Sequence, residues 1–278
     1  MPWTETTRAD YRRMGLRYAS DLTDREWSWI TPYMPSPRSV GRPRTTVLRE
    51  VVNALFYMAS TGCQWRMLPK DFPPYTTVQG YFYAWREAGL WQTINHCLVM
   101  AARELEGREA SPTAGVIDSQ SVKTTESGGI RGFDAGKKVK GRKRHIVTDT
   151  LGLLIGLRVH GADIQDRDGA PDLLKAVRHG FPWLAHLFAD GGYAGPKLNG
   201  VLKKLGQWTL EIIKRSDTAK GFEVLPRRWV VERTFAWLGR CRRLAKDWET
   251  SIASAEAWIT VAHIRLLTRR LARYCYVA

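Results

Sequence analysis

The sequence predicts a mixed α/β fold in which an all-helical part precedes a part that alternates strands and helices. Apolar side chains recur at helical spacing through residues 1–110, whereas short apolar strands alternate with helices further along the chain. A polar break at 106–112 separates the two patterns. Because 278 residues suffice for about two domains, we expect a small helical domain over 1–110 and an α/β domain over 111–278.

The helical part carries recognisable helix starts. Thr23 and Glu26 have the spacing of a capping box, in which each side chain binds the backbone amide of the other residue. Further helices are expected to begin at Thr45 or Thr46, to begin at Thr76 or Thr77, and to span 90–105. Short helices with tight breaks can form a helix-turn-helix that reads DNA, and the alternative is a plain helical bundle.

Short apolar segments predict the strands of the second part. They lie at 114–117, 144–148, 153–160, 184–189 and 209–214, with a hairpin turn at 149–152. Helices are expected over 168–178, 196–205 and 230–244. A further basic amphipathic helix is expected over 255–274. It could pack on the core, join two protomers or contact DNA, and the sequence leaves these three roles open.

The charge balance favours a polyanionic partner. Lysine and arginine number 43 against 27 acidic residues, which gives a formal net charge of +16. Residues 227–278 alone carry 11 basic and 4 acidic residues. A field of that sign attracts nucleic acid; ribosome association and general solubility are the alternatives. The composition is otherwise that of a globular protein, which excludes a disordered, collagen-like or coiled-coil chain.

Nothing in the sequence predicts export or membrane insertion. No apolar run approaches the roughly 18 residues of a membrane span, and the first residues lack a basic start followed by an apolar stretch. The four cysteines form no C-x-x-C pair, which argues against a zinc ribbon and a disulfide scaffold. We therefore expect a cytoplasmic protein with reduced thiols.

Three acidic residues are candidates for metal binding. Asp118 and Asp190 each follow a predicted apolar strand, and Glu232 lies in a predicted helix that also carries arginines. Singly, each has a simpler explanation, because aspartates begin turns and Glu232 can pair with a neighbouring arginine. Together, two aspartates and a glutamate can hold two Mg²⁺ ions about 3.5–4 Å apart, the arrangement used for in-line phosphoryl transfer.

A strongly basic segment lies near the first of these acids in the chain. Residues 134–145 include six lysines and arginines, and we expect them to form a loop close to Asp118. A run of charges is usually a solvated face. Beside a carboxylate cluster, however, it favours contact with the phosphate backbone of nucleic acid.

Several short motifs follow one another along the chain. They are LTDREW (22–27), GRPR (41–44), TGCQWRMLP (61–69), VIDSQSVK (116–123), the block 134–152, ADGGY (189–193) and RWVVERTFAWL (228–238). Together they resemble bacterial insertion-sequence transposases of the five type, which belong to the DDE class. The resemblance covers nearly the whole chain, in order.

The resemblance implies an RNase H-like catalytic domain whose metal-binding triad falls on Asp118, Asp190 and Glu232. It also implies two Mg²⁺ ions, for which Mn²⁺ can substitute. Broader relatives carry a Tyr, Arg, Glu, Lys signature around the last acid, and Arg228 and Glu232 match it. The Tyr and Lys positions hold Leu225 and Gly239, with Arg240 adjacent as a hypothetical replacement. The residues assigned to DNA phosphates are Lys123, Lys137, Lys138, Lys140, Arg142, Lys143, Arg144, Arg228, Arg233 and Arg240.

The activity that the resemblance implies is transposition. The enzyme would cut double-stranded DNA at the ends of its element and transfer the freed 3′ hydroxyl into target DNA. Because two ends must be brought together, a homodimer or higher oligomer on DNA is expected. Two alternatives remain: an RNase H-like endonuclease that cuts without joining, and a domesticated or regulatory DNA-binding protein.

Overall fold

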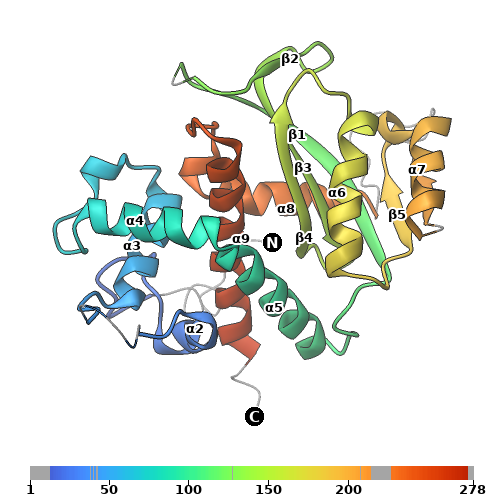
Figure 1. The fold of residues 1–278 in the computed structure, drawn as a ribbon. Coiled ribbons are helices and arrows are strands. Elements are labelled where there is room, and N and C mark those ends of the chain that lie inside the picture. Colours follow the sequence, from blue (N-terminus) through green and yellow to red (C-terminus); the bar gives the residue numbers. More distant parts are fainter. Residues whose placement is uncertain are drawn as a thin grey trace.

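The computed structural model describes residues 13–37, 39, 41, 43–126, 128–206, 208–213 and 227–274. Its helices from the first part and its sheet lie side by side, and the long helix α9 (Ile252–Tyr274) runs between them (Figure 1). Buried apolar side chains of both parts belong to one continuous core. The boundary near residue 110 is therefore a change of secondary structure, and the division into two domains stays a prediction.

The helical part contains α2 (Asp24–Ser28), α3 (Leu48–Thr61), α4 (Tyr75–Glu87) and α5 (Leu90–Leu105) within the described residues. The predicted capping box is confirmed: the Thr23 hydroxyl accepts from the Glu26 amide at 3.2 Å, and the Glu26 carboxylate accepts from the Thr23 amide at 2.9 Å. The predicted span of α5 is confirmed as well. Whether these helices read DNA as a helix-turn-helix stays a prediction.

The starts predicted for α3, at Thr45 or Thr46, and for α4, at Thr76 or Thr77, are shifted from the observed ones. These helices begin after Val47 and Pro74, and neither has a side-chain cap. Leu48 and Val78, in the first turns, are buried in the core. Tertiary packing supplies most of the stability of a short helix, so the apolar face decides where each one starts.

The second part is built on a mixed sheet. Its strands are β1 (Ala114–Lys123), β2 (Gly132–Asp134), β3 (Val139–Asp149), β4 (Leu154–Gly161), β5 (His186–Ala189) and β6 (Thr209–Ile212). The order is β2-β3-β1-β5-β6. β4 pairs with residues 142–148 of β3, which follow the residues that pair with β2. β3 runs antiparallel to β1, β2 and β4, whereas β1, β5 and β6 run parallel.

Two strands are longer than predicted. β1 continues through Asp118 to Lys123, so Asp118 does not end its strand. β3 begins at Val139, so most of the basic segment is strand rather than loop. The two extensions pair with each other, because Ser121 to Lys123 match Lys143 back to Gly141 in antiparallel register. Residue 214, the predicted end of the last strand, lies outside the described residues.

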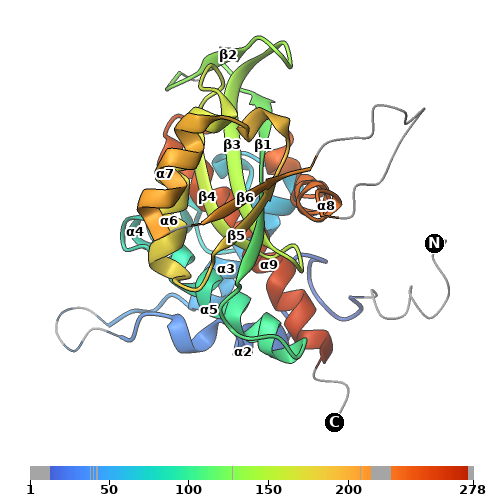
Figure 2. The same ribbon diagram turned by 90° about the vertical axis from the view of Figure 1, so that its right-hand side faces the viewer.

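Helices cover both faces of the sheet (Figure 2). α6 (Asp166–Gly180) packs on β3 and β4, and α7 (Pro196–Gly206) lies beside α6. On the other face, α8 (Trp229–Gly239) packs on β1 and β3. The predicted helix 230–244 is thus shorter, and Arg242–Leu244 forms a separate 3-10 turn.

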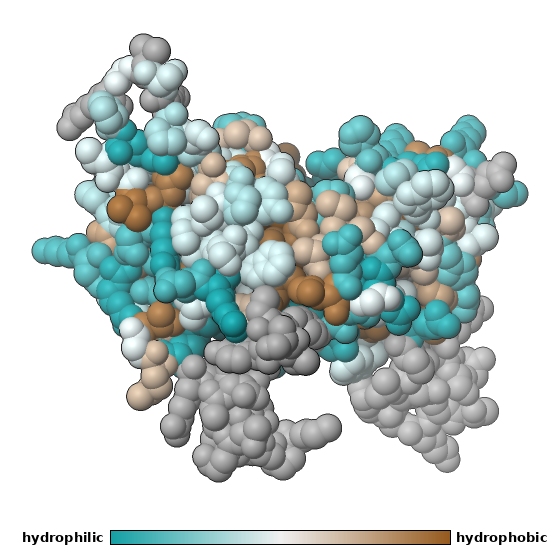
Figure 3. Space-filling model, turned by 90° about the horizontal axis from the view of Figure 1, so that it is seen from below, coloured by the Kyte–Doolittle hydropathy of each residue, from teal (hydrophilic) through white to brown (hydrophobic). Residues whose placement is uncertain are grey.

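Of the three roles left open for the last helix, the structure shows packing on the core. α9 packs against α3 and α5 of the helical part and against β4 of the sheet. On the face drawn in Figure 3, hydrophilic side chains surround small apolar patches. Among the described residues, no helix is both long and apolar enough to cross a membrane.

A buried histidine ties α9 to both parts. The Nε2 atom of His263 accepts from the Leu154 amide at 3.1 Å, so Nδ1 carries the proton and donates to Asn95 Oδ1 at 2.6 Å. Burial, followed by the positive charge of Arg270, lowers the pKa of His263 to about 3. Protonation would place an uncompensated charge in the core and break the bond to Leu154.

This histidine is expected to make the protein acid-sensitive. The folded pKa of His263 lies below the unfolded value of about 6.5. At pH values between these two, the unfolded state binds more protons, so the free energy of unfolding decreases as the pH is lowered. Between pH 7 and pH 5 we expect His263 to remove about 2 kcal/mol of the free energy of unfolding. Urea denaturation at both pH values checks this. The His263→Gln variant should show a correspondingly smaller loss, and equal losses in both proteins would contradict the assignment.

Candidate active site

Asp118 lies in the middle of β1, opposite Ile146 of β3. Paired residues on neighbouring strands share a face of the sheet, and Ile146 contacts the same small cavity as Phe235 and Leu238 of α8. Asp118 therefore points to the face that α8 covers. β5 pairs with β1 only up to Val116, so Asp118 stands just beyond the end of β5.

Asp190 follows β5 directly and begins a 3-10 turn, Gly191–Tyr193. Its Oδ1 accepts from the Gly192 amide at 2.8 Å, which fixes the carboxylate at the turn. A Cβ on Gly192 would lie 3.0 Å from that oxygen and 3.3 Å from a carboxylate oxygen of Asp166. Glycine thus lets the turn fit between two carboxylates.

Glu232 lies in the first turn of α8, and Arg228 immediately precedes that helix. One terminal nitrogen of Arg228 is 3.5 Å from Glu232 Oε1 and 3.9 Å from Asp190 Oδ2. The guanidinium therefore lies between the two acids. Glu232 is the most open of these groups, with 46% of its side chain exposed.

The two aspartates and their cationic neighbours form one electrostatic unit. Burial and the Asp190 carboxylate raise the pKa of Asp118, the Ser119 amide, Lys137 and Arg228 oppose them, and the net pKa is about 6. The ammonium group of Lys137 binds the Ser119 carbonyl at 3.1 Å. The site thus brings together acids from β1, the end of β5 and α8 around two cations.

The donor set suits a divalent cation, but the acids are not gathered into a finished metal site. Carboxylate oxygens are the ligands that Mg²⁺ and Mn²⁺ prefer, and a cation would relieve the repulsion between Asp118 and Asp190. Glu232 is instead paired with Arg228. Across the part of the chain that the structure describes, no three Asp, Glu, His or Cys side chains lie close enough to hold a metal ion.

A polar network on the opposite face of the same strands was missed from the sequence. Asp166, in the first turn of α6, accepts from the Ser119 hydroxyl at 2.7 Å and pairs with Lys143 at 2.9 Å. Burial alone would raise the pKa of Asp166, but these two hydrogen bonds bring it below the usual value. The sequence showed only an acidic helix start, which is common to many helices.

The network continues through two neutral histidines. His160 donates from Nδ1 to the Gly161 carbonyl at 2.9 Å, so its Nε2 accepts from His145 Nδ1 at 3.0 Å. The hydroxyl of Tyr193 then donates to His145 Nε2 at 2.6 Å. Burial lowers the pKa of His145 to about 3 and raises that of Tyr193 well above 10. This series of hydrogen bonds holds the turn after Asp190 against β3.

The basic segment divides into exposed and buried residues. Lys123, Lys138 and Lys140 are exposed and line a groove beside Phe133, while Lys137 binds Ser119, the residue next to Asp118. Arg142, Lys143 and Arg144 are buried, with exposures of 0%, 4% and 5%. The prediction that these three contact DNA is corrected, because strand pairing turns them inward.

The buried members bind partners inside the protein. Arg142 pairs with Asp247 at 3.1 Å and donates to three backbone carbonyls. Arg144 donates to the carbonyls of Leu244 and Lys246 at 2.7 and 3.2 Å. Arg233 and Arg240 lie on a different side of α8 from Glu232 and line a separate cavity. Leu225 lies outside the described residues.

Comparison with known proteins identifies the family. Residues 109–267, more than half of the chain, match the family described as "Transposase DDE domain". Residues 22–95 match the family described as "Putative transposase of IS4/5 family". All three acids of the candidate site lie within the first match. No solved structure gives a significant match.

Two curated relatives match part of the chain. One, from Burkholderia cepacia, is described as "Putative transposase for insertion sequence element IS402" and is 32% identical over 111 residues, 37% of this chain and 52% of that protein. The other, "Uncharacterized protein y4sN" from Sinorhizobium fredii, is 32% identical over 85 residues, 31% of this chain and 66% of that protein. The matches thus span between half and two thirds of the relatives' length. The resemblance expected from the motifs is confirmed, and the chain belongs to the family of insertion-sequence transposases with a DDE domain.

Proposed function

We propose that the protein cuts double-stranded DNA at the ends of its element and joins the freed 3′ hydroxyl to target DNA, using Asp118, Asp190 and Glu232. The observation that carries the proposal is the convergence of two of these acids on Arg228, with the third beside them. The acids come from three separate elements inside the matched DDE region. The mixed sheet, with β3 antiparallel to the parallel strands, is consistent with an RNase H-like catalytic domain.

Two divalent ions, Mg²⁺ or Mn²⁺, fit this donor set. Asp118 and Asp190 would hold them, and Glu232 would join once Arg228 releases it. When bound, the ions supply charge neutralisation for phosphoryl transfer. Without them, Arg228 and Lys137 offset the negative charge of the acids.

The chain's own residues hold and orient the reacting groups. The Gly192 amide and the Ser119 amide each bind one aspartate carboxylate, which keeps the two acids in place. Arg228 is suited to exchange its carboxylate partners for a DNA phosphate, because a guanidinium binds both groups in the same geometry. Lys123, at the end of β1, and Lys138 and Lys140, on the β2–β3 hairpin, line one basic groove and would contact the DNA backbone without reading sequence.

Strand transfer in vitro tests the proposal. The protein would be incubated with Mg²⁺, DNA carrying the gene's own flanking sequences, and a target plasmid, and the products would be separated on a denaturing gel. We expect cut ends and covalently joined product, both absent in EDTA. Cutting without joining would instead indicate an endonuclease. Specific binding without any cutting, under conditions where a control transposase is active, would indicate a regulatory DNA-binding protein.

A further inference from the structure

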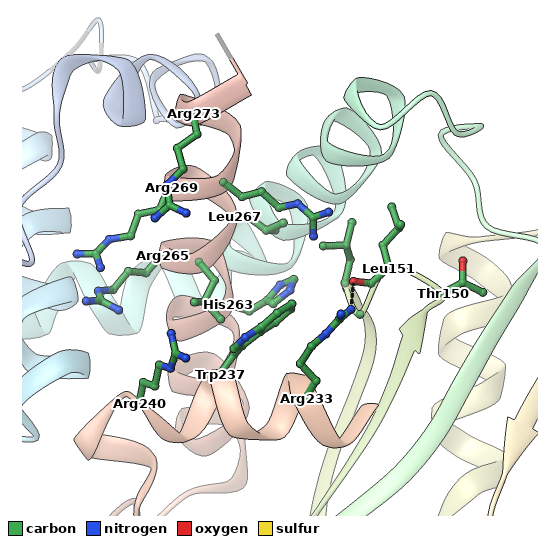
Figure 4. Close-up of a pocket in the computed structure, with 14 residues that line it drawn as sticks. Thr150, Leu151, Arg233, Trp237, Arg240, His263, Arg265, Leu267, Arg269 and Arg273 are labelled. Carbon is green, nitrogen blue, oxygen red and sulfur yellow. Dashed lines mark hydrogen bonds between the residues drawn. The ribbon is translucent and has the colours of Figure 1, made fainter. Parts of the chain in front are cut away.

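A cavity of about 660 Å³ lies between α8, α9 and the β3–β4 turn. Figure 4 shows Arg265, Arg269 and Arg273 along one side of α9, with Arg240 below Arg265, while Arg233 rises from α8 toward Leu151 on the other side. The lining of the cavity contains six arginines and no acidic residue: Arg233, Arg240, Arg265, Arg269, Arg270 and Arg273. We call this the arginine groove.

The charges of the groove are only partly offset. Arg270 pairs with Glu106 at 2.5 Å, and Glu26, which Arg13 binds, acts on Arg265 and Arg269 from a neighbouring position. Arg233 and Arg269 bind backbone carbonyls, of Leu151 at 2.9 Å and Ala19 at 2.7 Å. Carbonyls satisfy hydrogen bonds without cancelling a charge.

Two arginines show the excess of positive charge most clearly. Arg240 is exposed and has no ion pair or side-chain hydrogen bond to any residue that the structure describes. Burial, followed by the positive charges of Arg265 and Arg13, lowers the pKa of Arg269 to about 9. An anion bound in the groove would be attracted to these arginines and would offset the repulsion between them.

The spacing of the arginines favours a polymer of phosphates over a single one. Positions 265, 269 and 273 are four residues apart, so they share one side of α9 and span about 12 Å at 1.5 Å per residue. One strand of duplex DNA presents a phosphate about every 3.4 Å along the axis. Roughly three to four phosphates of one strand would therefore run past this row.

The groove also adjoins the candidate active site. α8 presents Arg228 and Glu232 toward the aspartates, and Arg233, Trp237 and Arg240, at helical spacing, toward α9. One helix thus separates the two sites. A backbone bound in the groove would be continuous with DNA lying across the start of α8.

We propose that the arginine groove is a second DNA-binding surface, which holds the phosphodiester backbone of a DNA segment next to the one in the active site. The inference rests on the proposed function only in taking DNA as the substrate. The Trp237 and Leu151 side chains supply apolar surface beside the cations, which suits the sugars of a backbone.

DNA binding without cleavage tests the groove. Fluorescence anisotropy with a short labelled duplex, in EDTA and over a series of salt concentrations, would compare wild type with Arg269→Gln/Arg273→Gln. Each lost phosphate contact lowers the slope of log affinity against log salt by about one, so we expect a fall of about two and at least a tenfold loss of affinity near 0.1 M salt. The exposed Arg273→Gln single variant should show about half the change in slope.

The matched control removes the same charge elsewhere. Lys175→Gln/Lys204→Gln, on α6 and α7, should leave affinity and slope close to wild type. Equal losses in both double variants would mean that only overall charge matters and would overturn the groove. So would wild-type binding by the groove variants, or a changed oligomeric state in light scattering with unchanged DNA binding, which would make the groove a protomer contact.

Two further measurements complete the test. One distinguishes a DNA backbone from a single phosphate as the ligand, and the other distinguishes the groove from the active site. Inorganic phosphate or a mononucleotide that displaces the duplex from wild type at micromolar concentration would identify a single-phosphate site and contradict a backbone groove. Asp190→Ala keeps the groove and removes one carboxylate beside Arg228, so in EDTA it should bind DNA at least as tightly as wild type, with a salt slope that is not lowered. Loss of groove binding with cleavage intact, or the reverse, therefore distinguishes the two claims.

Discussion

Asp190→Ala is expected to lower DNA cleavage and joining by about 10²–10³-fold, the effect of removing a group that stabilises charge in the transition state. Asp190 is the acid that lies near both Asp118 and Arg228. The fold should remain intact. The two aspartates repel each other, and the loss of one should leave the thermal midpoint unchanged or slightly raised. Cleavage rates and a thermal melt, measured on the same preparation, check both parts.

The matched control for this variant is Asp172→Ala. Asp172 lies on α6 with 78% of its side chain exposed, so its replacement removes the same charge without touching the site. It should cleave at the wild-type rate. If Asp190→Ala retained cleavage, or if both variants lost it equally, the assignment of Asp190 would be wrong.

Arg142→Met is expected to lower the free energy of unfolding by about 3–5 kcal/mol, the usual cost of breaking one side of a buried ion pair. The guanidinium of Arg142 is fully buried, and it joins β3 to Asp247 and to the carbonyls of Glu249 and Thr250. Methionine fills a similar volume but leaves Asp247 buried and unpaired. Urea denaturation followed by fluorescence measures the loss.

Lys140→Met separates this role from DNA contact. Lys140 lies two residues earlier in β3, but it is exposed. Its replacement should weaken DNA binding, lower the salt slope by about one and leave stability nearly unchanged. The opposite result, in which Arg142→Met is stable but deficient in DNA binding, would support the sequence-based prediction that Arg142 contacts DNA.

Local patterns were sufficient for much of the fold. The capping box at Thr23, the span of α5 and the hairpin between β3 and β4 each depend on residues close together in the chain. The site acids were also accessible from the sequence, because the motifs around them are short and occur in order. A pair between Glu232 and a neighbouring arginine was expected, but the sequence could not show that the fold also places Arg228 next to Asp190.

The errors share one physical cause. The apolar pattern of β1 stops before Asp118, and only its pairing with β3 shows that the strand continues. The same pairing turns Arg144 inward, where its carbonyl partners lie about 100 residues further along the chain. Asp166 is another case, since its link to Ser119 crosses 47 residues. Non-local partners decide burial, and a run of charges in the sequence does not reveal them.

Metal-directed cleavage of the protein tests the central claim most directly. Fe²⁺ binds sites of this kind at least as tightly as Mn²⁺, and with ascorbate and peroxide it cuts the polypeptide next to where it is held. If Asp118, Asp190 and Glu232 share a metal site, fragments should end near all three residues, Mg²⁺ should suppress them, and Asp190→Ala should abolish them. Fragments confined to other parts of the chain, or cuts near the three acids that persist in Asp190→Ala, would contradict a shared site.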